Sequence, residues 1–184
     1  MDAHSIAATL PADTAADRGD RLGALFDTHY PRLYRLARRL VANADDAHDL
    51  VQETFLRAAT ARRPVPTGQT SEEAWLVRVL VNLRRDQWRR TASRNRVDAR
   101  MRAAWPRQEP DQESALIARS AIWRALDVLP PRRRAVVVLH ELEERSVREI
   151  SALLGITAIT VRWHLSVGRR DLARVLDSRK GETR

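Results

Sequence analysis

The stretch from Ser146 to Arg170, SVREISALLGITAITVRWHLSVGRR, restricts the fold more than any other part of the chain. Ser146 and Glu149 have the spacing of a capping box, which predicts where a helix begins. Gly155 supplies the left-handed residue that commonly ends a helix, and Thr157 can cap a second one. Because two helices joined by so short a turn must cross at a steep angle, this stretch predicts a helix-turn-helix unit.

The second helix of this unit has one apolar face and one basic face. Arginine can donate two hydrogen bonds to guanine and can pair with phosphate, so we expect the outward face to bind duplex DNA. The residues expected to contact DNA are Ile159, Arg162, Trp163, Ser166, Arg169 and Arg170. An ordinary helical hairpin with a solvated basic face is the alternative. The agreement of the caps, the glycine and the basic face favours DNA binding.

The charge of the chain also favours an anionic partner. Its 184 residues carry a formal net charge of +9 and include no cysteine, which excludes thiol catalysis and cysteine zinc sites. A membrane surface is the weaker choice of partner, because there is neither an apolar run of about 18 residues nor a signal peptide. We therefore expect a cytoplasmic protein that binds nucleic acid.

Apolar residues at helical spacing divide the chain into two small domains, which makes the predicted fold class all-α. Residues 1–20 lack a sustained period and are predicted to be a disordered tail, followed by a helical domain over 21–93. Regular spacing lapses over 94–114, where prolines and charged residues predict a flexible linker. A four-helix domain over 115–178, ending in the helix-turn-helix, and a tail over 179–184 complete the chain.

Three local features lead to separate predictions. Pro31 lies inside an apolar stripe, where it predicts a kink or two abutting helices. Thr70 and Glu73 have the spacing of another capping box, after a loop rich in proline. The run AVVVLH, residues 135–140, has strand propensity, but it lies between helices too close to leave it a sheet partner. We expect it to be a buried helix.

The predicted helix ADDAHDLVQETFLRAA has an apolar face and an acidic face. The apolar face recurs at helical spacing and is expected to be buried. The other face carries Asp49, Gln52, Glu53 and Leu56. An outward leucine among acids and amides is either ordinary surface or part of a partner site, and this face alone does not decide between them.

The predicted helix EEAWLVRVLVNLRRDQWRR divides in a similar way. Its expected core stripe is Leu76, Val79, Leu80 and Leu83. Its other face carries Trp75, Arg78, Asn82, Arg85 and Arg89. An aromatic ring, an amide and several guanidiniums in one row can stack an unpaired base and bind its backbone, as proteins that grip single strands do. The alternative is that Trp75 is buried and the arginines are solvated.

No motif for catalysis or metal binding is present. The sequence HELEE at His140 lacks the second histidine of the H-E-x-x-H zinc motif, because Glu144 stands in its place. A glycine-rich phosphate loop and a G-x-S-x-G elbow are also absent. We therefore expect no enzymatic activity, no cofactor and no metal.

Three segments occur in a specific order, with the linker between the second and the third. They are DDAHDLVQETFLRA, WLVRVLVNLRRD and LPPRRRAVVVLHELEERSVREISALLGITAITVRWHL. In this order they resemble the extracytoplasmic-function (ECF) group of the sigma-70 family, the small bacterial subunits that direct RNA polymerase to promoters. The resemblance covers roughly residues 22–176. It implies a transcription initiation factor without catalytic activity.

The resemblance implies a role for each face. The face with Asp49 and Leu56 matches the surface that docks on the β′ clamp helices of core RNA polymerase. The face with Trp75 matches the segment that opens the minus-ten element, and the loop from Pro64 to Thr70 matches the loop that captures a flipped base. The last helix would bind the duplex minus-thirty-five element. The implied partners are core RNA polymerase, through the β′ clamp helices and the β flap, and promoter DNA, both double-stranded and melted. An anti-sigma factor is a further candidate.

The chain departs from the family pattern in the last helix. Trp163 and His164 replace a small polar residue and a basic one, and Val167 stands where an arginine is common. Tryptophan cannot pair bidentately with a base, so it can offer only apolar contact with thymine methyls or the sugar edge, and one indole donor. The identity of the upstream element is therefore left open.

Two other classes of protein remain as alternatives. A free-standing dimeric helix-turn-helix regulator would bind duplex DNA without polymerase, and an RNA-binding module would use the aromatic and arginine row. A dimeric repressor has no use for Trp75, Asn82 and Arg85 beside an acidic docking face. This first domain favours the sigma factor.

Overall fold

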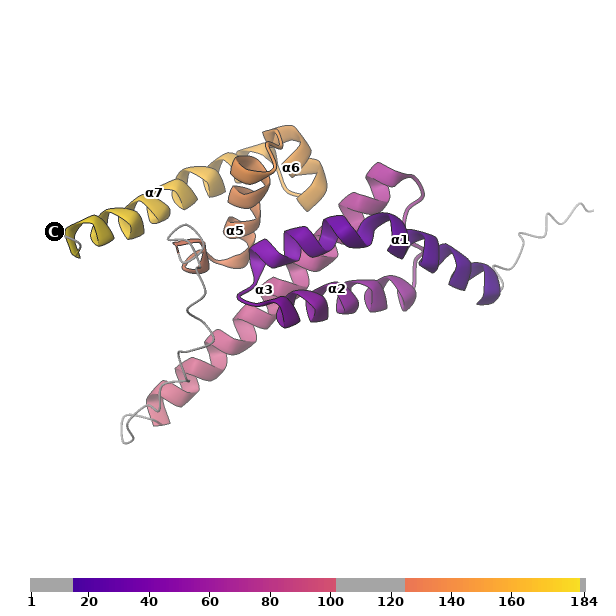
Figure 1. The fold of residues 1–184 in the computed structure, drawn as a ribbon, viewed down its shortest axis with the longest axis horizontal. Coiled ribbons are helices and arrows are strands. Elements are labelled where there is room, and N and C mark those ends of the chain that lie inside the picture. The colour runs from indigo at the N-terminus through magenta and orange to yellow at the C-terminus, as the bar shows by residue number, and fades with distance from the viewer. Residues whose placement is uncertain (1–14, 102–124, 183–184) are drawn as a thin grey trace, which may run out of the picture.

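The computed structural model describes residues 15–101 and 125–182, and within these ranges the chain forms helices and no strand (Figure 1). The N-terminal bundle consists of α1 (Ala15–Leu40), α2 (Ala44–Ala59) and α3 (Gln69–Met101). The C-terminal bundle consists of α5 (Pro131–Val137), the π-helix η2 (Val138–Leu142), α6 (Val147–Leu154) and α7 (Ala158–Glu182). The predicted all-α fold class is confirmed.

The N-terminal bundle is built around a leucine core. The side chain of Asn43 caps α2 by accepting a hydrogen bond from the backbone N–H of Asp46 at 2.7 Å. The carboxylates of Asp45 and Asp46 lie in the first turn, where they favour the positive end of the helix dipole. The fully buried side chains from the three helices include Leu33, Leu36, Leu50, Leu76 and Leu80.

The predicted helix-turn-helix is confirmed in the C-terminal bundle. The Ser146 hydroxyl accepts from the Glu149 N–H at 3.2 Å, and the Glu149 carboxylate accepts from the Ser146 N–H at 2.8 Å. Gly155 ends α6 with a φ of +63°, and Thr157 Oγ1 accepts from the Thr160 N–H at 3.2 Å. The axes of α6 and α7 are bent by 108°, as in helix-turn-helix units.

The run at 135–140 is helical, as predicted, and all of it except the half-buried His140 is buried. It begins in α5, with Pro131 at a first-turn position where its missing N–H costs nothing. After Val137 the helix widens into η2, and Val136, Val138 and Leu139 are completely buried. With no strand beside it, this segment satisfies its backbone hydrogen bonds within a helix.

Helix bounds differ from the predicted domain bounds at two places. Helix α1 begins at Ala15, so residues 15–20 of the predicted tail are helical, which agrees with the high helix propensity of alanine. Helix α3 continues to Met101, so residues 94–101 of the predicted linker are helical as well. The rest of the predicted linker and the start of the second domain, residues 102–124, lie outside the described residues.

The structure differs from the predictions at Pro31 and at Thr70. Helix α1 continues through Pro31, because its apolar stripe packs on both sides of the proline. Of the two alternatives, a kink or two abutting helices, the second is therefore wrong. Thr70 does not cap α3, since the helix already begins at Gln69 and the Gly68 carbonyl accepts its first backbone hydrogen bonds. Glu73 forms an ion pair with Arg32 at 2.6 Å instead of closing a capping box.

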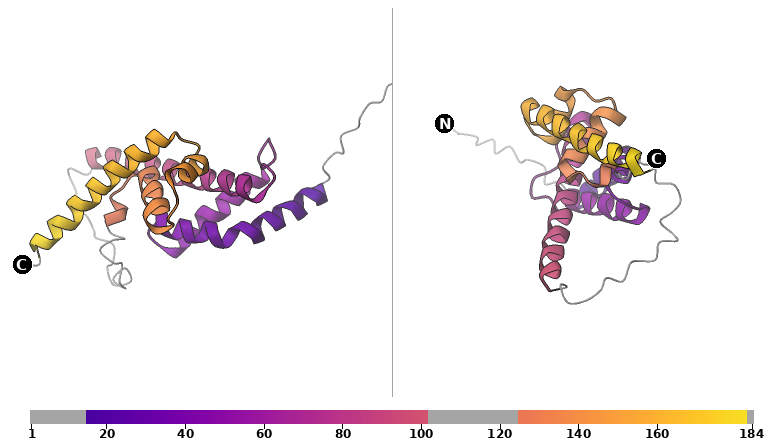
Figure 2. Two further views of the ribbon diagram at one scale, coloured as in Figure 1. Left: turned by 90° about the horizontal axis from the view of Figure 1, so that it is seen from above. Right: turned by 90° about the vertical axis from the view of Figure 1, so that its left-hand side faces the viewer.

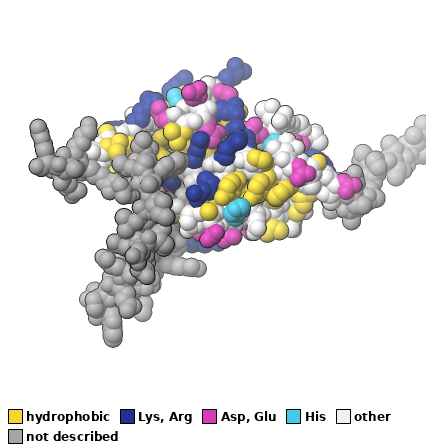
Figure 3. All heavy atoms as spheres, viewed as in Figure 1, with side chains coloured by type: hydrophobic (Ala, Val, Ile, Leu, Met, Phe, Trp, Pro, Cys, Tyr) yellow, Lys and Arg dark blue, Asp and Glu magenta, His cyan; other side chains and the backbone are white. Residues whose placement is uncertain are grey.

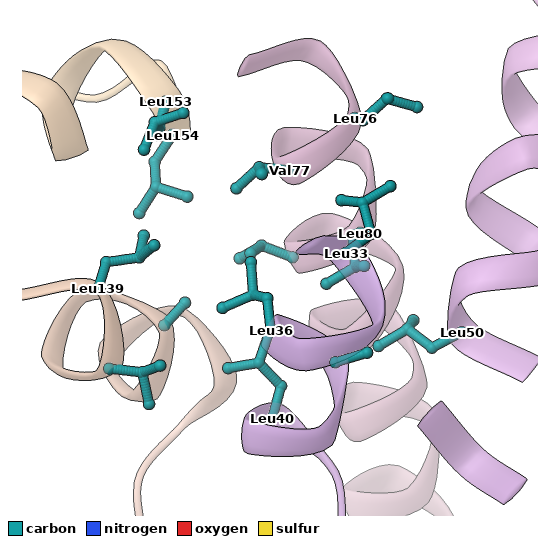
Figure 4. Close-up of a cluster of buried hydrophobic side chains, with 14 of the residues drawn as sticks. Leu33, Leu36, Leu40, Leu50, Leu76, Val77, Leu80, Leu139, Leu153 and Leu154 are labelled. Carbon is teal, nitrogen blue, oxygen red and sulfur yellow. The ribbon is translucent and has the colours of Figure 1, made fainter. Parts of the chain in front are cut away.

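The two bundles pack against each other and share one hydrophobic core (Figure 4). Val77 of α3 points toward Leu153 and Leu154 of α6. Leu139 of η2 lies on the side that faces Leu36 of α1. The end of α7 and the start of α1 lie at opposite ends of the molecule (Figures 1 and 2).

This packing changes the predicted core stripe of α3. Val77 and Val81 are buried together with Leu76 and Leu80, whereas the predicted core residues Val79 and Leu83 are half-buried. Helix α3 is covered on two sides, by the other N-terminal helices and by the C-terminal bundle. A periodicity calculated for one amphipathic face therefore misplaces the stripe.

Charged side chains join the two bundles around this core. Glu143 accepts hydrogen bonds from Arg32 at 3.3 Å and from Arg39 at 3.2 Å. The buried Arg134 donates to the Arg39 carbonyl at 2.6 Å and pairs with Asp127. Because a buried guanidinium requires both a countercharge and hydrogen-bond acceptors, these contacts tie α5 to the end of α1.

Candidate nucleic-acid interface

The outward face of α7 is open to solvent. All six side chains predicted to contact duplex DNA are exposed on it: Ile159, Arg162, Trp163, Ser166, Arg169 and Arg170. Ile159 is 77% exposed and Trp163 is 54% exposed, whereas Val161 and Leu165 face the core. The structure thus brings these six residues together on one helix face.

Helix α5 supports α7 from behind through a close approach at Gly168. A Cβ added to this glycine would lie 2.7 Å from Val137 Cγ2 and 3.3 Å from Arg133 Cγ. A side chain larger than hydrogen fits there only if the Val137 side chain or the helix that carries it shifts. Gly168 therefore sets the distance between the outward face of α7 and the rest of the bundle.

Trp163 lies between two other side chains. The guanidinium carbon of Arg133 is 5.5 Å from the centroid of the indole, within the range of a cation–π interaction. Asp171 accepts a hydrogen bond from Arg133 at 2.6 Å, which orients the guanidinium. The His164 ring meets the indole edge to face at 4.9 Å. Burial, and then the nearby charges of Arg133 and Arg132, lower the pKa of His164.

A groove runs beside the same face. It is lined by His140, Val147, Arg162, Leu165, Ser166, Arg169, Arg170 and Ala173. Arg169 is already engaged, because its Nε and Nη2 donate to Glu141 Oε1 at 2.9 and 2.7 Å. Within the described part of the chain, Arg162 and Arg170 form no ion pair. These two arginines are therefore the available cations of the groove.

The face of α3 predicted to bind single strands is partly covered by the C-terminal bundle. Arg78 donates to the Ala152 carbonyl at 3.3 Å, and its Nε would be 2.9 Å from a Cβ added to Gly155. The Asn82 carbonyl oxygen accepts from Arg132 at 3.3 Å. Two of the five predicted residues are thus bound within the protein.

The other three residues of this face differ in exposure. Trp75 is half-buried and packs against the core. Its exposure is therefore intermediate between the predicted exposed ring and the alternative of a buried one. Arg85 is half-buried and contacts Asp86 at 3.3 Å, and Arg89 is exposed. Burial, and then the charge of Arg85, lower the pKa of Arg132. Like charges are therefore held close together where the two bundles meet.

The predicted polymerase-docking face lies on the outer side of α2. Asp49, Gln52 and Leu56 are exposed, with 58% of Leu56 accessible. Glu53 is half-buried and pairs with Arg57 at 2.9 Å. Figure 3 shows hydrophobic side chains over α1 and α2 next to a group of basic ones in the centre of the same view. The structure leaves this face free of the C-terminal bundle.

The loop before α3 is tied to α1. Arg21 donates to the Val65 carbonyl at 2.6 Å, and the Val65 side chain is buried. A hollow between the loop and the helices is lined by Gly19, Arg21, Leu22, Leu25, Ala58, Ala59, Ala61, Arg62, Pro64 and Val65. The loop predicted to capture a flipped base is thus anchored at one point and hollowed beside it.

The arginines of α5 were not among the predicted site residues. Arg132 contacts Asn82, Arg133 contacts Trp163 and Asp171, and the third, Arg134, is buried. The signal was the run of three arginines directly before the segment predicted to be a buried helix. Such a run requires partners, because buried charges are rarely left unpaired.

Two further properties concern only the described residues. No three His, Asp or Glu side chains cluster as metal ligands would. No single helix is long and apolar enough to cross a membrane. Helices α6 and α7 taken together have the length and apolar composition of a membrane span, but a bend of 108° separates them.

Family models match both halves of the chain. The model described as Sigma-70 region 2 matches residues 25–94, and that described as Sigma-70, region 4 matches residues 119–172. The ECF RNA polymerase sigma factor SigE of Mycolicibacterium smegmatis is 38% identical over 161 residues, covering 84% of this chain and 61% of the relative. SigL of Mycobacterium tuberculosis is 35% identical, covering 86% of this chain and 90% of the relative.

Solved structures show the same fold. The sigma factor RpoE from Bartonella quintana, solved with the anti-sigma factor NepR, aligns with a TM-score of 0.54 at 22% identity, over 89% of this chain and 98% of that one. CnrH, solved with the cytosolic domain of CnrY, aligns with a TM-score of 0.52 at 26% identity, over 87% of this chain and 90% of that one.

Proposed function

Because the chain belongs to the ECF group of bacterial sigma factors, we propose that it binds core RNA polymerase in the cytoplasm and directs it to specific promoters. The protein has no catalytic activity of its own in this role. The observation that carries the proposal is the open face of α7, where six predicted DNA contacts lie together on the second helix of a helix-turn-helix.

Helix α7 is assigned to the duplex minus-thirty-five element. The second helix of a helix-turn-helix enters the major groove, and its side chains reach the base edges. Arg162 and Arg170 line a groove beside this face and are available for phosphate or guanine. The 108° bend between α6 and α7 lets α7 project from the bundle.

The face of α3 is assigned to the melted minus-ten strand. Trp75 offers a ring for stacking, and Arg85 and Arg89 offer charges for the backbone. Arg78 and Asn82 can join them only after they release Ala152 and Arg132, so promoter opening requires the C-terminal bundle to leave this face. Binding to polymerase, through the outer face of α2, is the step proposed to separate the bundles.

Run-off transcription with purified protein and core polymerase on genomic fragments tests the proposal. We expect discrete transcripts that core polymerase alone does not make. Absence of such transcripts, together with binding to duplex DNA and no association with polymerase in a pull-down at moderate salt, would indicate the dimeric regulator instead. Comparable affinity for unrelated RNAs without promoter-dependent transcription would indicate an RNA-binding module.

Separate variants test the three faces. Leu56→Arg places a charge on the α2 face and should abolish polymerase association while leaving duplex binding intact. Trp75→Ala combined with Asn82→Ala should leave polymerase binding intact and impair open-complex formation. Arg162→Ala should cost about 1–3 kcal/mol at one upstream base pair if it reads that base, and should act uniformly across sequences if it contacts only phosphate.

A further inference from the structure

Two large apolar side chains project from the DNA-facing side of α7 without contributing to the core. Ile159 is 77% exposed and Trp163 is 54% exposed, one helical turn apart on the same side. Exposed apolar groups at a recognition site contribute favourable binding free energy when a partner covers them and removes them from water.

Charges beside the pair identify a duplex as the partner. Arg162 and Arg170 line the adjoining groove, and the chain as a whole carries a net charge of +9. A mainly apolar protein surface would leave these guanidiniums unpaired, whereas the phosphates of a duplex neutralise them. In the major groove, the 5-methyl group of thymine is the apolar group that the bases present.

The indole is oriented before any DNA arrives. Arg133 covers one face of the Trp163 ring at 5.5 Å from its centroid, and Asp171 binds this guanidinium at 2.6 Å. His164 meets the ring edge to face, so two neighbours limit its rotation. An aromatic ring that is already ordered loses little conformational entropy when it is covered.

Building on the proposed function, we propose that Ile159 and Trp163 recognise thymine methyl groups in the upstream promoter element, and that Arg133 is the positioning residue that holds the indole against the groove. Hydrogen bonds from arginines alone cannot distinguish thymine from uracil, because the two bases present the same donors and acceptors. The methyl group is the sole difference, and it makes the inference testable without altering base pairing.

The experiment uses the complete protein bound to core polymerase and a promoter found by run-off transcription. Thymine is replaced by uracil only within the upstream element, one position at a time, and affinity is measured by competition. We expect one or two positions at which uracil weakens binding by about fourfold, the effect of losing one buried methyl-sized group. Uracil elsewhere in the promoter provides the matched DNA control.

Protein variants connect the effect to these residues. Trp163→Ala should bind thymine and uracil promoters equally at the position that Trp163 contacts, and Ile159→Ala should do so at the neighbouring one. Arg133→Met keeps the aliphatic stem that packs near Gly168. It should reduce the thymine-to-uracil ratio, meaning affinity for the thymine promoter divided by affinity for the uracil promoter, although the indole remains. Arg162→Ala, the control, should weaken binding to both promoters and leave the ratio unchanged. Thermal melting checks that each variant is folded.

Three outcomes would overturn the inference while leaving the proposed function in place. They are equal affinity for thymine and uracil promoters, an upstream element without thymine on either strand, and a thymine-to-uracil ratio that survives Trp163→Ala and Ile159→Ala. An unchanged ratio in Arg133→Met would overturn the positioning role alone. Failure to obtain any promoter-dependent transcript would instead overturn the proposed function.

Discussion

The exposed face of α7 and the partly covered face of α3 are built from similar side chains, namely arginines and one tryptophan. On α7, Trp163 is more than half exposed, and Arg162 is available to a ligand. On α3, Arg78 and Asn82 are bound by the C-terminal bundle. The chemistry of the two faces is therefore alike, and their difference in availability comes from where each helix lies relative to the boundary between bundles.

If the two faces bind DNA as proposed, this difference makes them available at different stages. The α7 face depends on one supporting helix, α5, and is complete within its own bundle. The α3 face becomes complete only when Arg78 and Asn82 exchange internal partners for a ligand. In the proposed function, promoter recognition by duplex contacts can thus precede strand capture, provided that the contacts between the bundles are weak enough to break.

The largest expected effect comes from a cavity in the shared core. Leu139→Ala removes a completely buried side chain and should lower the free energy of unfolding by about 2–5 kcal/mol. If the bundles unfold as one unit, circular dichroism and tryptophan fluorescence should give one coincident urea transition at lower urea. Leu176→Ala, at a side chain 36% exposed, should change stability by less than about 0.5 kcal/mol. Two transitions, only one of them shifted, would refute the shared core.

Removing the carboxylate that joins the bundles should expose the α3 face. Glu143→Gln weakens the contacts to Arg32 and Arg39, which should lower the free energy of unfolding by roughly 1–3 kcal/mol. Because Arg78 and Asn82 are then released more often, affinity for a single-stranded oligonucleotide of mixed sequence should rise, as measured by fluorescence anisotropy. The exposed neighbour Glu144 provides the control Glu144→Gln. Unchanged affinity in Glu143→Gln would show that the contacts do not limit access.

A pair of glycine substitutions separates tight packing from helix propensity. At Gly168 a new Cβ would meet Val137 at 2.7 Å, so Gly168→Ala should lower stability by about 1–2 kcal/mol and weaken duplex binding by displacing α7. At Gly23 in α1 an added Cβ meets nothing within 4 Å, so Gly23→Ala should raise stability by up to about 1 kcal/mol. Melting temperatures measure both effects. A stabilised Gly168→Ala variant would contradict the close approach of α5.

The smallest expected effect is a dependence of stability on pH. The pKa of His164 is lowered in the folded protein, mainly by burial and then by Arg133 and Arg132. The unfolded chain therefore binds more protons, and stability should fall as the pH drops from about 6.5 through the lowered folded pKa. His164→Gln should flatten the curve of melting temperature against pH in this range. An equally steep curve in the variant would assign the dependence to other groups.

Contacts between residues close together in the chain could be predicted from the sequence, whereas contacts between distant residues could not. Ser146 and Glu149 are three residues apart, so their capping box could be identified from spacing, as could the Gly155 turn. Glu143 is 111 residues from Arg32 and 104 from Arg39, and no local pattern relates them. Helical periodicity likewise misplaced the core stripe of α3, because it assumes one buried face where the structure has two.

The amino-acid sequence by itself determined the helices, the helix-turn-helix and the three candidate faces, since caps, glycines and periodic apolar residues act over one or two turns. Only the tertiary structure decided that the α3 face is partly covered, that α3 is buried on two sides and that Arg133 orients Trp163. These features depend on contacts between segments distant in the chain, whose free energies arise only when the bundles pack together.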